Sequence, residues 1–317
     1  MNKKVVLIIP YFGKVPDYFN LWLKSAERNS DYTFFIYTDL NFKVDENSNV
    51  KIKNISFDEL KERIKSLFGN NIKLKSPYKL CDYRPAYGVI FKDDITDFDF
   101  WGFCDIDLIF GNLNHFISNE IFENYDKLFY HGHFCLFKNC DKMNYLFMKK
   151  YENVCDFKFA SHTNYSCHFD ENGTVSYACE NEIDIKQYFK WCFYDVPYNS
   201  YKFITISSQY EKYAYWHNGN LFMCDADNNK NEIMYIHLQK RKMSNWLDID
   251  EKCNSFYILR DEFLDTKNVN IYDILNFIDI NRQNIFDLET KNKRKKQILD
   301  NILSGGLIAR LKSFKQK

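Results

Sequence analysis

The chain has 317 residues, 45% of them hydrophobic, which is enough to bury a substantial core in one large or two small domains. Glycine and proline are scarce, at 10 and 5 residues, which excludes a fibrous or low-complexity protein. The formal net charge is zero and the excess of basic residues is confined to the carboxyl end, which argues against nucleic acid as a partner. The 10 cysteines are spaced irregularly without a C-x-x-C pair, which predicts reduced core thiols and argues against a zinc site.

The first third of the chain alternates continuous apolar runs with amphipathic segments. The runs predict buried parallel strands, and the amphipathic segments predict helices that cover them. In chain order we expect a strand at 5–9, a helix at 17–29, a strand at 34–39, a helix at 57–68, a helical segment at 79–91 interrupted by Pro85, and a strand through 99–110. This order predicts an α/β fold with a Rossmann-type, mostly parallel sheet flanked by helices.

The second half of the chain is less regular. We expect two strands with a polar break at 126–138, a polar turn-rich segment at 161–174, a short strand at 233–238, and a mixed region at 256–286 that packs as closing helices. Neither an internal repeat nor a clear linker precedes residue 287. We therefore expect one main domain at 1–286 and a separate tail at 287–317.

The tail is basic and amphipathic. Between Lys291 and Lys317, nine Lys and Arg residues face one acid, so the tail carries +8 and the rest of the chain −8. This pattern suits docking on an anionic membrane surface, and the alternatives are a terminal helix packed on the domain or a disordered end. No stretch of about 18 apolar residues is present, and the amino-terminal apolar run is too short for a signal peptide. We expect a cytoplasmic protein, at most peripheral on the inner face of the plasma membrane.

Two aspartates, Asp105 and Asp107, interrupt the apolar run Asp99–Phe110. In an extended strand, side chains at i and i+2 point to the same side, so we expect both carboxylates to converge at a strand end. Convergent carboxylates repel each other unless one is protonated or a cation lies between them. Mg²⁺ or Mn²⁺, held together with substrate phosphates, resolves that repulsion. The alternative is a strand that runs into an Asp-rich turn.

Other polar groups follow the predicted parallel strands in the same way. Pro10 to Gly13 follows the first strand, and Asp39 ends the second. Ligands of parallel sheets bind at the carboxyl ends of the strands, so we expect these groups and the two aspartates to lie on one rim.

The chain contains five short motifs: Pro10–Gly13, Tyr37–Asp39, Tyr78–Pro85, Trp101–Asp107 and Ile236–Arg241. Together they resemble the motifs of GT-A glycosyltransferases. More narrowly, the chain resembles a DUF6625-like group of bacterial polysaccharide-locus glycosyltransferases, which is similar to glycosyltransferase families 8 and 32. The resemblance implies a GT-A-like sheet with a mixed acceptor-side subregion and a helical carboxyl end.

The resemblance implies a metal site. Asp107 would bind the ion, Asp105 would contact the metal or the donor ribose, and His237 would be the third ligand. A neutral imidazole favours Mn²⁺ over Mg²⁺ as the cofactor. For His237, the alternative is a strand-end histidine on a basic surface loop.

The resemblance also implies a donor site for a nucleotide-sugar of the UDP series. Asp39 would contact uracil or ribose beside Tyr11, and Lys240 and Arg241 would neutralise the departing diphosphate. The alternative for Asp39 is a cap of a helix or turn. The further donor-side residues are Pro10, Phe12, Lys79, Asp82 and Arg84, of which the last three could equally form a structural ion-pair cluster.

The acceptor side is less defined by the sequence. Asp170 and Glu171 are candidates for acceptor contact or for the base that an inverting transfer needs, and their alternative is an exposed turn. With Arg84 they make up the expected catalytic group, although the resemblance leans towards a retaining transfer. Further acceptor-side candidates are His131, His133, Trp216 and His217, for which buried structural roles are the alternative.

These expectations favour a metal-dependent glycosyltransferase. It would move a sugar from a nucleotide-diphosphate donor to a saccharide or lipid-linked oligosaccharide acceptor in capsular or surface polysaccharide synthesis. Two alternatives remain: a metal-dependent nucleotidyl or phosphoryl transferase, although the chain lacks a P-loop, and a non-catalytic glycan-binding module.

Overall fold

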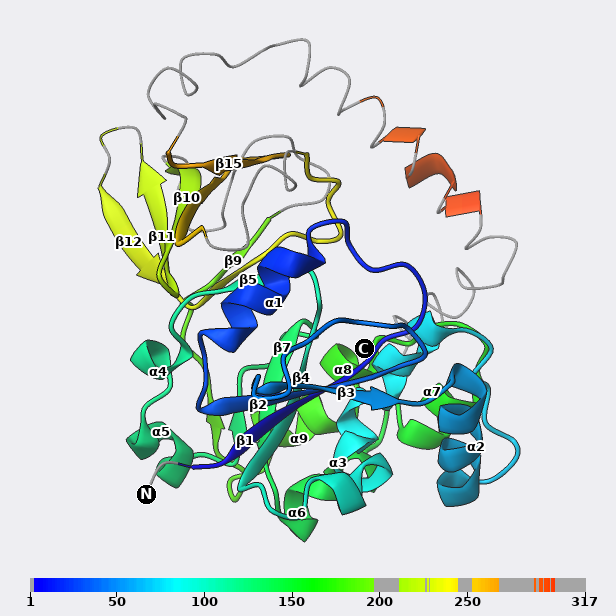
Figure 1. Ribbon diagram of the computed structural model, residues 1–317. Helices are drawn as coiled ribbons and strands as arrows, with labels where there is room; N and C mark the ends of the chain where they lie inside the picture. Colours follow the sequence, from blue (N-terminus) through cyan, green and yellow to red (C-terminus); the bar gives the residue numbers. More distant parts are fainter. Residues whose placement is uncertain are drawn as a thin grey trace.

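A computed structural model describes residues 3–196, 211–225, 227, 229–244 and 253–267, together with residues 288, 291–292, 294–296 and 298–299. Within these ranges the chain forms a mixed α/β structure with three sheets (Figure 1). The predicted boundary at residue 287 and most of the tail lie outside the described residues. The described tail positions are helical.

The largest sheet has seven strands in the order β3-β2-β1-β4-β7-β6-β8. Strands β3, β2, β1 and β4 run parallel, β7 is antiparallel to both β4 and β6, and β8 is parallel to β6. The strands are β1 (Val5–Pro10), β2 (Tyr32–Thr38), β3 (Val50–Asn54), β4 (Phe100–Cys104), β6 (Lys127–Leu128), β7 (Phe134–Lys138) and β8 (Gln187–Tyr188). The predicted mostly parallel sheet is therefore confirmed, and β3 is a strand that the sequence analysis missed.

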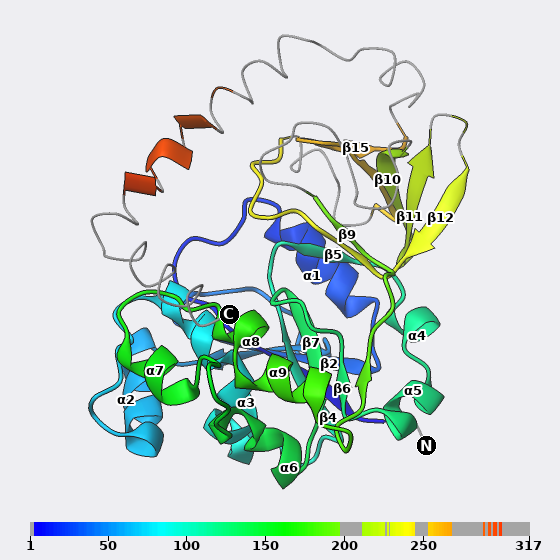
Figure 2. The ribbon, with the colours of Figure 1, turned by 180° about the vertical axis from the view of Figure 1, so that it is seen from behind.

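Helices cover both faces of this sheet (Figures 1 and 2). Alternate β1 side chains enter two different buried clusters: Val6 and Ile8 face α2, α3 and α6 to α9, whereas Leu7 and Ile9 face α1, α4 and α5. The helices are α1 (Phe19–Glu27), α2 (Phe57–Phe68), α3 (Tyr87–Ile90), α4 (Leu113–Phe116), α5 (Asn119–Asn124), α6 (Asp141–Asn144), α7 (Phe157–His162), α8 (Phe169–Asn172) and α9 (Thr174–Asn181). Three 3₁₀ segments add η1 (Pro77–Ala86), η2 (Lys92–Asp94) and η3 (Leu146–Met148).

Local signals explain where some of these helices begin and end. Helix α2 has the predicted bounds because Ser56 and Glu59 form a capping box at its start and Gly69 follows its last residue. The predicted helix at 79–91 is instead mostly 3₁₀, and its α-helical part begins only after Pro85.

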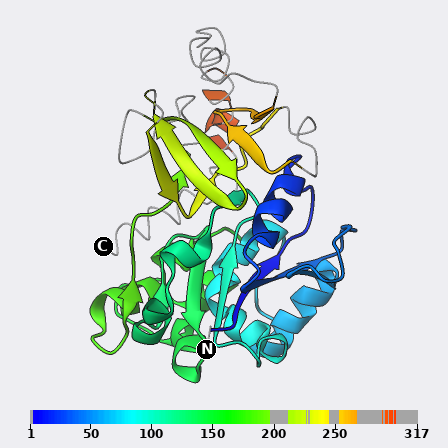
Figure 3. The ribbon, with the colours of Figure 1, turned by 60° about the vertical axis from the view of Figure 1, so that its left-hand side comes forward.

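Two smaller sheets follow in the second half of the chain. A three-stranded sheet joins β5 (Leu108–Phe110), β13 (Tyr235–His237) and β9 (Tyr194–Asp195). A five-stranded sheet has the order β12-β11-β10-β14-β15, and α1 packs between it and the large sheet (Figure 3). Its strands are β10 (Glu211–His217), β11 (Asn220–Asp225), β12 (Lys230–Ile233), β14 (Ser255–Ile258) and β15 (Phe263–Asp265).

The expected closing helices at 256–286 are wrong for the described part of that region. Residues 255–258 and 263–265 pair as neighbouring antiparallel strands, and residues 268–286 lie outside the described residues. All 10 cysteines are free, as predicted, but only five of them are buried in the core and the other five are half-buried. Among the described residues, none of the helices has the length and apolarity needed to span a bilayer.

Candidate metal centre

Asp105 and Asp107 lie in a turn, not in a strand. Strand β4 ends at Cys104, and β5 begins at Leu108. The expectation of two side chains on one face of an extended strand is therefore wrong. The buried side chain of Ile106 enters the core between the two carboxylates, and the turn directs the chain from the large sheet into the three-stranded sheet. The carboxylates nevertheless converge, because both approach His237.

Strand pairing brings His237 to the two aspartates. Strand β13 pairs with β5 on one side and with β9 on the other, so His237 lies opposite Leu108 and Asp195. Its Nε2 is 3.5 Å from Oδ1 of Asp107 and 3.9 Å from Oδ2 of Asp105. Its Nδ1 lies 2.9 Å from Oδ1 of Asp195. The Nδ1–H group is thus directed to Asp195, which leaves Nε2 facing the aspartate pair.

The carboxylates around His237 stabilise positive charge in this centre. Burial alone would raise the pKa of Asp107, but His237 and the Lys240 N–H group hold that pKa below its usual value. Burial alone would lower the pKa of His237, but Asp107, Asp195 and Asp105 raise it to about 10. Without a metal, a protonated imidazole therefore balances the carboxylates.

The donor atoms fit a divalent ion. Ligand atoms of Asp105, Asp107 and His237 lie within 4.8 Å of one another, and a second overlapping group contains His133, Asp195 and His237. Oδ1 of Asp107 is buried and accepts no hydrogen bond from the part of the chain that the structure describes. Two carboxylates and one imidazole are ligands suited to Mn²⁺. A metal-binding histidine usually donates its other ring N–H to a carboxylate, and Asp195 occupies that position at His237.

The backbone is strained just after His237 in the chain. Gln239 and Lys240 both have left-handed backbones, with φ of 52° and 54°, a conformation that costs about 1–2 kcal/mol per residue. The strained loop lets the Lys240 N–H group donate to Oδ2 of Asp107 at 2.5 Å. The Gln239 amide donates to Oδ1 of Asp195 at 2.6 Å. The left-handed loop thus allows two hydrogen bonds, which hold the carboxylates of Asp107 and Asp195 beside His237.

Arg84 connects the metal centre to α8. One guanidinium nitrogen bonds to Oδ1 of Asp105, and another donates to the Gly132 carbonyl and to Oδ2 of Asp170, the last at 3.0 Å. Its guanidinium also lies over the Phe103 ring, 5.2 Å from the centroid. With two carboxylates already bound, Arg84 acts chiefly by positioning Asp105 and Asp170.

Lys79 and Asp82 form a buried ion pair. Their side chains are 3% and 0% exposed, and Nζ lies 2.5 Å from Oδ2. Asp82 also accepts the backbone N–H groups of Cys167 and Phe169, so the pair fixes the entry to α8. Because neither side chain is accessible, the structure contradicts their predicted contact with the donor and supports the structural alternative.

Helix α8 carries Asp170 and Glu171 towards Arg84. Burial raises the pKa of Asp170 to about 7, against the opposing effect of Arg84. Glu171 is exposed and accepts the Gly132 N–H group at 2.8 Å. A Cβ at Gly132 would lie 2.9 Å from a carboxylate oxygen of each residue, so a larger residue here would displace these side chains. Asp170 is buried beside Arg84 and is not part of the exposed turn offered as its alternative.

Of the predicted acceptor-side residues, His131 and His133 lie beside the metal centre, whereas Trp216 and His217 belong to the five-stranded sheet. His131 and His133 stack at 5.1 Å, and the His133 ring lies 4.5 Å from His237. Trp216, in contrast, is buried, and its indole donates to the Phe110 carbonyl at 2.9 Å. The expectation that Trp216 stacks on a sugar is therefore wrong. His217 is exposed on β10 and stacks on Tyr215, within the five-stranded sheet.

The predicted donor residues at the ends of the first two strands differ in their exposure and in their proximity to the metal centre. Tyr11 follows β1 and lies near the centre: burial, then Asp107 and Asp105, raise its pKa. Pro10 ends β1 and is half-buried, and Asp39 is exposed directly after β2. Phe12 is buried against Phe57 at 5.4 Å, so its side chain belongs to the core and not to a donor surface.

The two basic residues after β13 differ in accessibility. Lys240 is exposed, and its ammonium lies over the Tyr78 ring, 5.4 Å from the centroid. Arg241 is buried, and it donates to the Arg260 carbonyl at 2.9 Å. The geometry therefore keeps Lys240 as a candidate for diphosphate contact and contradicts that role for Arg241.

Asp195 is the functional candidate that the sequence analysis missed. It lies in a short strand, and only the pairing of β9 with β13 brings it to His237, 42 positions later in the chain. The available signal was a lone carboxylate, flanked by Tyr194 and Val196 in an apolar segment.

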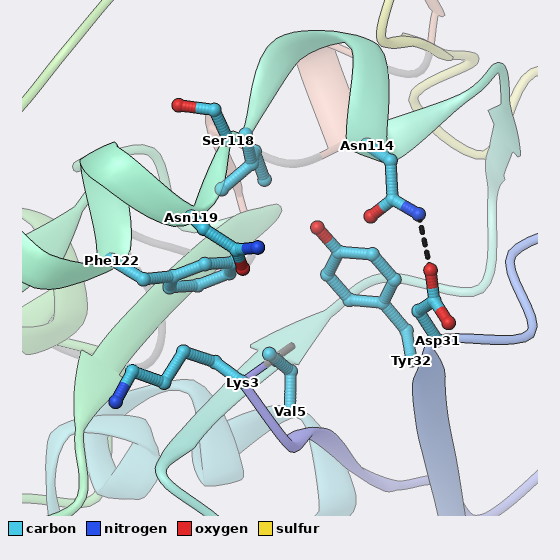
Figure 4. A pocket seen from close by; sticks show the side chains of 9 residues that line it. Lys3, Val5, Asp31, Tyr32, Asn114, Ser118, Asn119 and Phe122 are labelled. Carbon is cyan, nitrogen blue, oxygen red and sulfur yellow. Dashed lines mark hydrogen bonds between the residues drawn. The ribbon is translucent and has the colours of Figure 1, made fainter. Parts of the chain in front are cut away.

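A surface pocket lies at the opposite end of the large sheet (Figure 4). It is lined by Val5 and Tyr32, the first residues of β1 and β2, and by Asn114, which donates to Asp31. The candidate metal centre, in contrast, lies beyond the carboxyl ends of β1 and β4. None of the predicted site residues lines this pocket.

Comparison with curated proteins gives no match. The model of a family of unknown function, DUF6625, matches residues 7–267. The matched region contains Asp105, Asp107, Asp195 and His237, as well as Arg84 and α8. On this match over most of its length, the chain belongs to the DUF6625 family.

Proposed function

We propose that this protein is a metal-dependent glycosyltransferase that uses a nucleotide-diphosphate sugar, in the first instance a UDP-sugar. The observation that carries the proposal is the convergence of Asp105, Asp107 and His237 beyond the carboxyl end of β4. The Asp105 side chain is 23% exposed, and oxygen ligands suit an ion that is shared with substrate phosphates. Lys240 is exposed, and its positive charge helps to lower the pKa of Asp107 in the same centre.

The arrangement of the large sheet supports a GT-A type of fold. Its parallel part has the strand order 3-2-1-4, which is also the order of the first four strands in dinucleotide-binding α/β sheets. In such sheets a nucleotide binds beyond the carboxyl ends of the strands. Tyr11 and Asp39 follow β1 and β2 at that edge, so we assign the nucleoside to them.

Asp105, Asp107 and His237 would hold Mn²⁺ or Mg²⁺. When bound, the ion supplies positive charge to the diphosphate, the leaving group of a glycosyl transfer. The protein's own residues prepare this site: Asp195 holds the Nδ1–H group of His237, so that the imidazole presents Nε2 to the ion. Lys240 adds a second positive charge, which acts on Asp107.

Asp170 and Glu171 are the carboxylates on the acceptor side. Arg84 orients Asp170, and the Gly132 N–H group orients Glu171. Glu171 is accessible to an acceptor hydroxyl, and in an inverting transfer it would take up the hydroxyl proton. Retention of the anomeric configuration stays our expectation, and proton NMR of the first-formed product measures it.

We further propose that the acceptor is a saccharide unit of a surface polysaccharide, carried on a lipid at the inner face of the plasma membrane. This part of the proposal depends on the motif resemblance and on the basic composition of 291–317.

The direct test is a donor assay with the full chain, Mn²⁺ and a panel of UDP-sugars, in which released UDP is measured. We expect Asp107→Asn to lower the rate by about 10²-fold or more, because the ligand charge is lost while the Lys240 N–H group keeps an acceptor. Asp97→Asn, a change at an exposed aspartate, is the matched control. Equal rates in both variants would contradict the assignment, and release of pyrophosphate would favour nucleotidyl transfer.

A further inference from the structure

Three aromatic side chains form an exposed platform beside the metal centre. Tyr130, Phe189 and Trp191 are 38%, 37% and 36% exposed. The Tyr130 and Phe189 rings lie 4.5 Å apart, and the Phe189 and Trp191 rings lie 5.9 Å apart. The three residues come from the segments that follow β6 and β8, neighbouring strands of the large sheet. We call these three residues the aromatic platform.

The aromatic platform is connected to the metal centre by histidine rings. His131 contacts all three platform rings, at 4.3 Å from Tyr130, 5.9 Å from Phe189 and 5.5 Å from Trp191. His131 stacks on His133, which in turn contacts His237. A ligand on the platform is therefore separated from the metal ligand His237 by only two rings.

The platform and the proposed donor site belong to different parts of the large sheet. Strands β4 and β7 separate β1 and β2 from β6 and β8. The platform approaches His237 through His133, whereas Tyr11 follows β1 near Asp107 and Asp105. A donor nucleotide at the ends of β1 and β2 leaves the platform free for a second substrate.

A carboxylate lies at the edge of the platform. Glu171 accepts the N–H group of Gly132, the residue that follows His131, and is itself exposed. Exposed aromatic rings stack on the C–H faces of pyranoses, and a carboxylate accepts hydrogen bonds from their hydroxyl groups. The negative charge of Glu171 opposes the binding of an acidic sugar.

We propose that the aromatic platform, with Glu171 at its edge, binds the saccharide acceptor as a neutral pyranoside. The inference rests on the proposed glycosyltransferase function and adds to it the acceptor class and the residues Tyr130, Phe189 and Trp191. A purely structural role explains the platform less well, because buried Phe193 already fills the space beneath His131 and Trp191.

Tryptophan fluorescence tests this inference directly. Trp22, Trp101 and Trp216 are buried, so Trp191 is the most accessible tryptophan of the described residues. The probes are the methyl β-glycosides of glucose, galactose and N-acetylglucosamine, with methyl β-glucuronide as the acidic counterpart. At least one neutral glycoside should protect Trp191 from acrylamide quenching, and the glucuronide should not.

Two variants make the test specific. Trp191→Phe should abolish the protected signal but retain binding by calorimetry, because an aromatic ring remains. Trp191→Ala should weaken glycoside binding about tenfold, and its fold is checked by circular dichroism. Glu171→Gln should raise the affinity for the glucuronide relative to the neutral glycosides.

UDP binding with Mn²⁺ is measured on the same variants to separate the two proposals. Retained UDP binding without any protection by a neutral glycoside overturns the acceptor inference alone. Glycoside protection without UDP and Mn²⁺ binding by the wild type overturns the glycosyltransferase proposal and leaves a glycan-binding platform. Loss of UDP binding in Trp191→Ala, with glycoside binding unchanged, would assign the platform to the donor and overturn the inference.

Discussion

The buried pair of Lys79 and Asp82 allows the structural and functional interpretations of this motif to be separated. Replacing Lys79 by Met leaves the carboxylate of Asp82 buried. Among the residues that the structure describes, its remaining donors are the backbone N–H groups of Cys167 and Phe169. Breaking a buried ion pair in this way costs about 3–5 kcal/mol. We expect a loss of stability near the upper end of this range, because Lys79 also donates to the carbonyl of Ala160 at 2.8 Å.

The measurement is the free energy of unfolding in urea, with no ligand present. Lys79→Met should lose about 3–5 kcal/mol, whereas Lys75→Met, at an exposed lysine, should change stability by less than about 0.5 kcal/mol. Adding Asp82→Asn to Lys79→Met removes the unpaired charge, so the double variant should lose less than the sum of the single losses.

The outcome that would refute this reasoning is a Lys79→Met protein of nearly wild-type stability with weakened UDP binding. It would mean that Lys79 serves the donor in solution, and the structural assignment of the pair would be wrong. The expected result instead links the pair to function through α8, whose entry Asp82 holds.

Four further predictions concern the centre and its neighbours. Asp195→Asn should weaken Mn²⁺ binding about 10–100-fold, measured by calorimetry, because the hydrogen bond that orients His237 changes. The pKa of Asp170 is raised by burial from 3.8 to about 7, so this group contributes stability below pH 4 that is lost as the pH rises to 7. Asp170→Asn should remove that part of the pH dependence in urea titrations, and an unchanged profile would contradict the assignment. Gly132→Ala should lower transfer to the acceptor, measured as product formation, because its Cβ meets the carboxylates of α8. Lys240→Ala should weaken UDP binding and reduce its salt dependence, and an unaltered salt dependence would exclude Lys240 from the diphosphate.

Continuous patterns in the sequence predicted the first half of the fold well. The apolar runs at β1 and β2 and the capped amphipathic helix α2 are local signals, and no distant contact changes them. Strand β3 has only five residues at the edge of the sheet. It was missed because the alternation of Val50 and Ile52 with Lys51 and Lys53 is a strand signal too short to stand out.

The five-stranded sheet had a local signal that the sequence analysis did not use. Asn218 and Gly219 have φ of 48° and 92°, and they form the two-residue turn between β10 and β11. An Asn-Gly pair between strands is a strong hairpin signal. The same signal would have placed Trp216 in a strand and favoured its core position.

The composition of the centre was only partly predictable. The motifs identified Asp105, Asp107 and His237, whose spatial convergence the structure now shows. The turn at Ile106 and the partner Asp195 depend on the pairing of β5, β13 and β9, which are far apart in the chain. Register between distant strands depends on tertiary packing, and local periodicity does not specify it.

The central claim is that Asp105, Asp107 and His237 bind a divalent ion together with a nucleoside diphosphate. The most direct measurement is an electron paramagnetic resonance titration of the full chain with Mn²⁺, with and without UDP. We predict one Mn²⁺ site per chain that UDP tightens, weakened at least about 100-fold in Asp107→Asn and unchanged in Asp97→Asn. The same Mn²⁺ affinity in Asp107→Asn and in the wild type would contradict the claim.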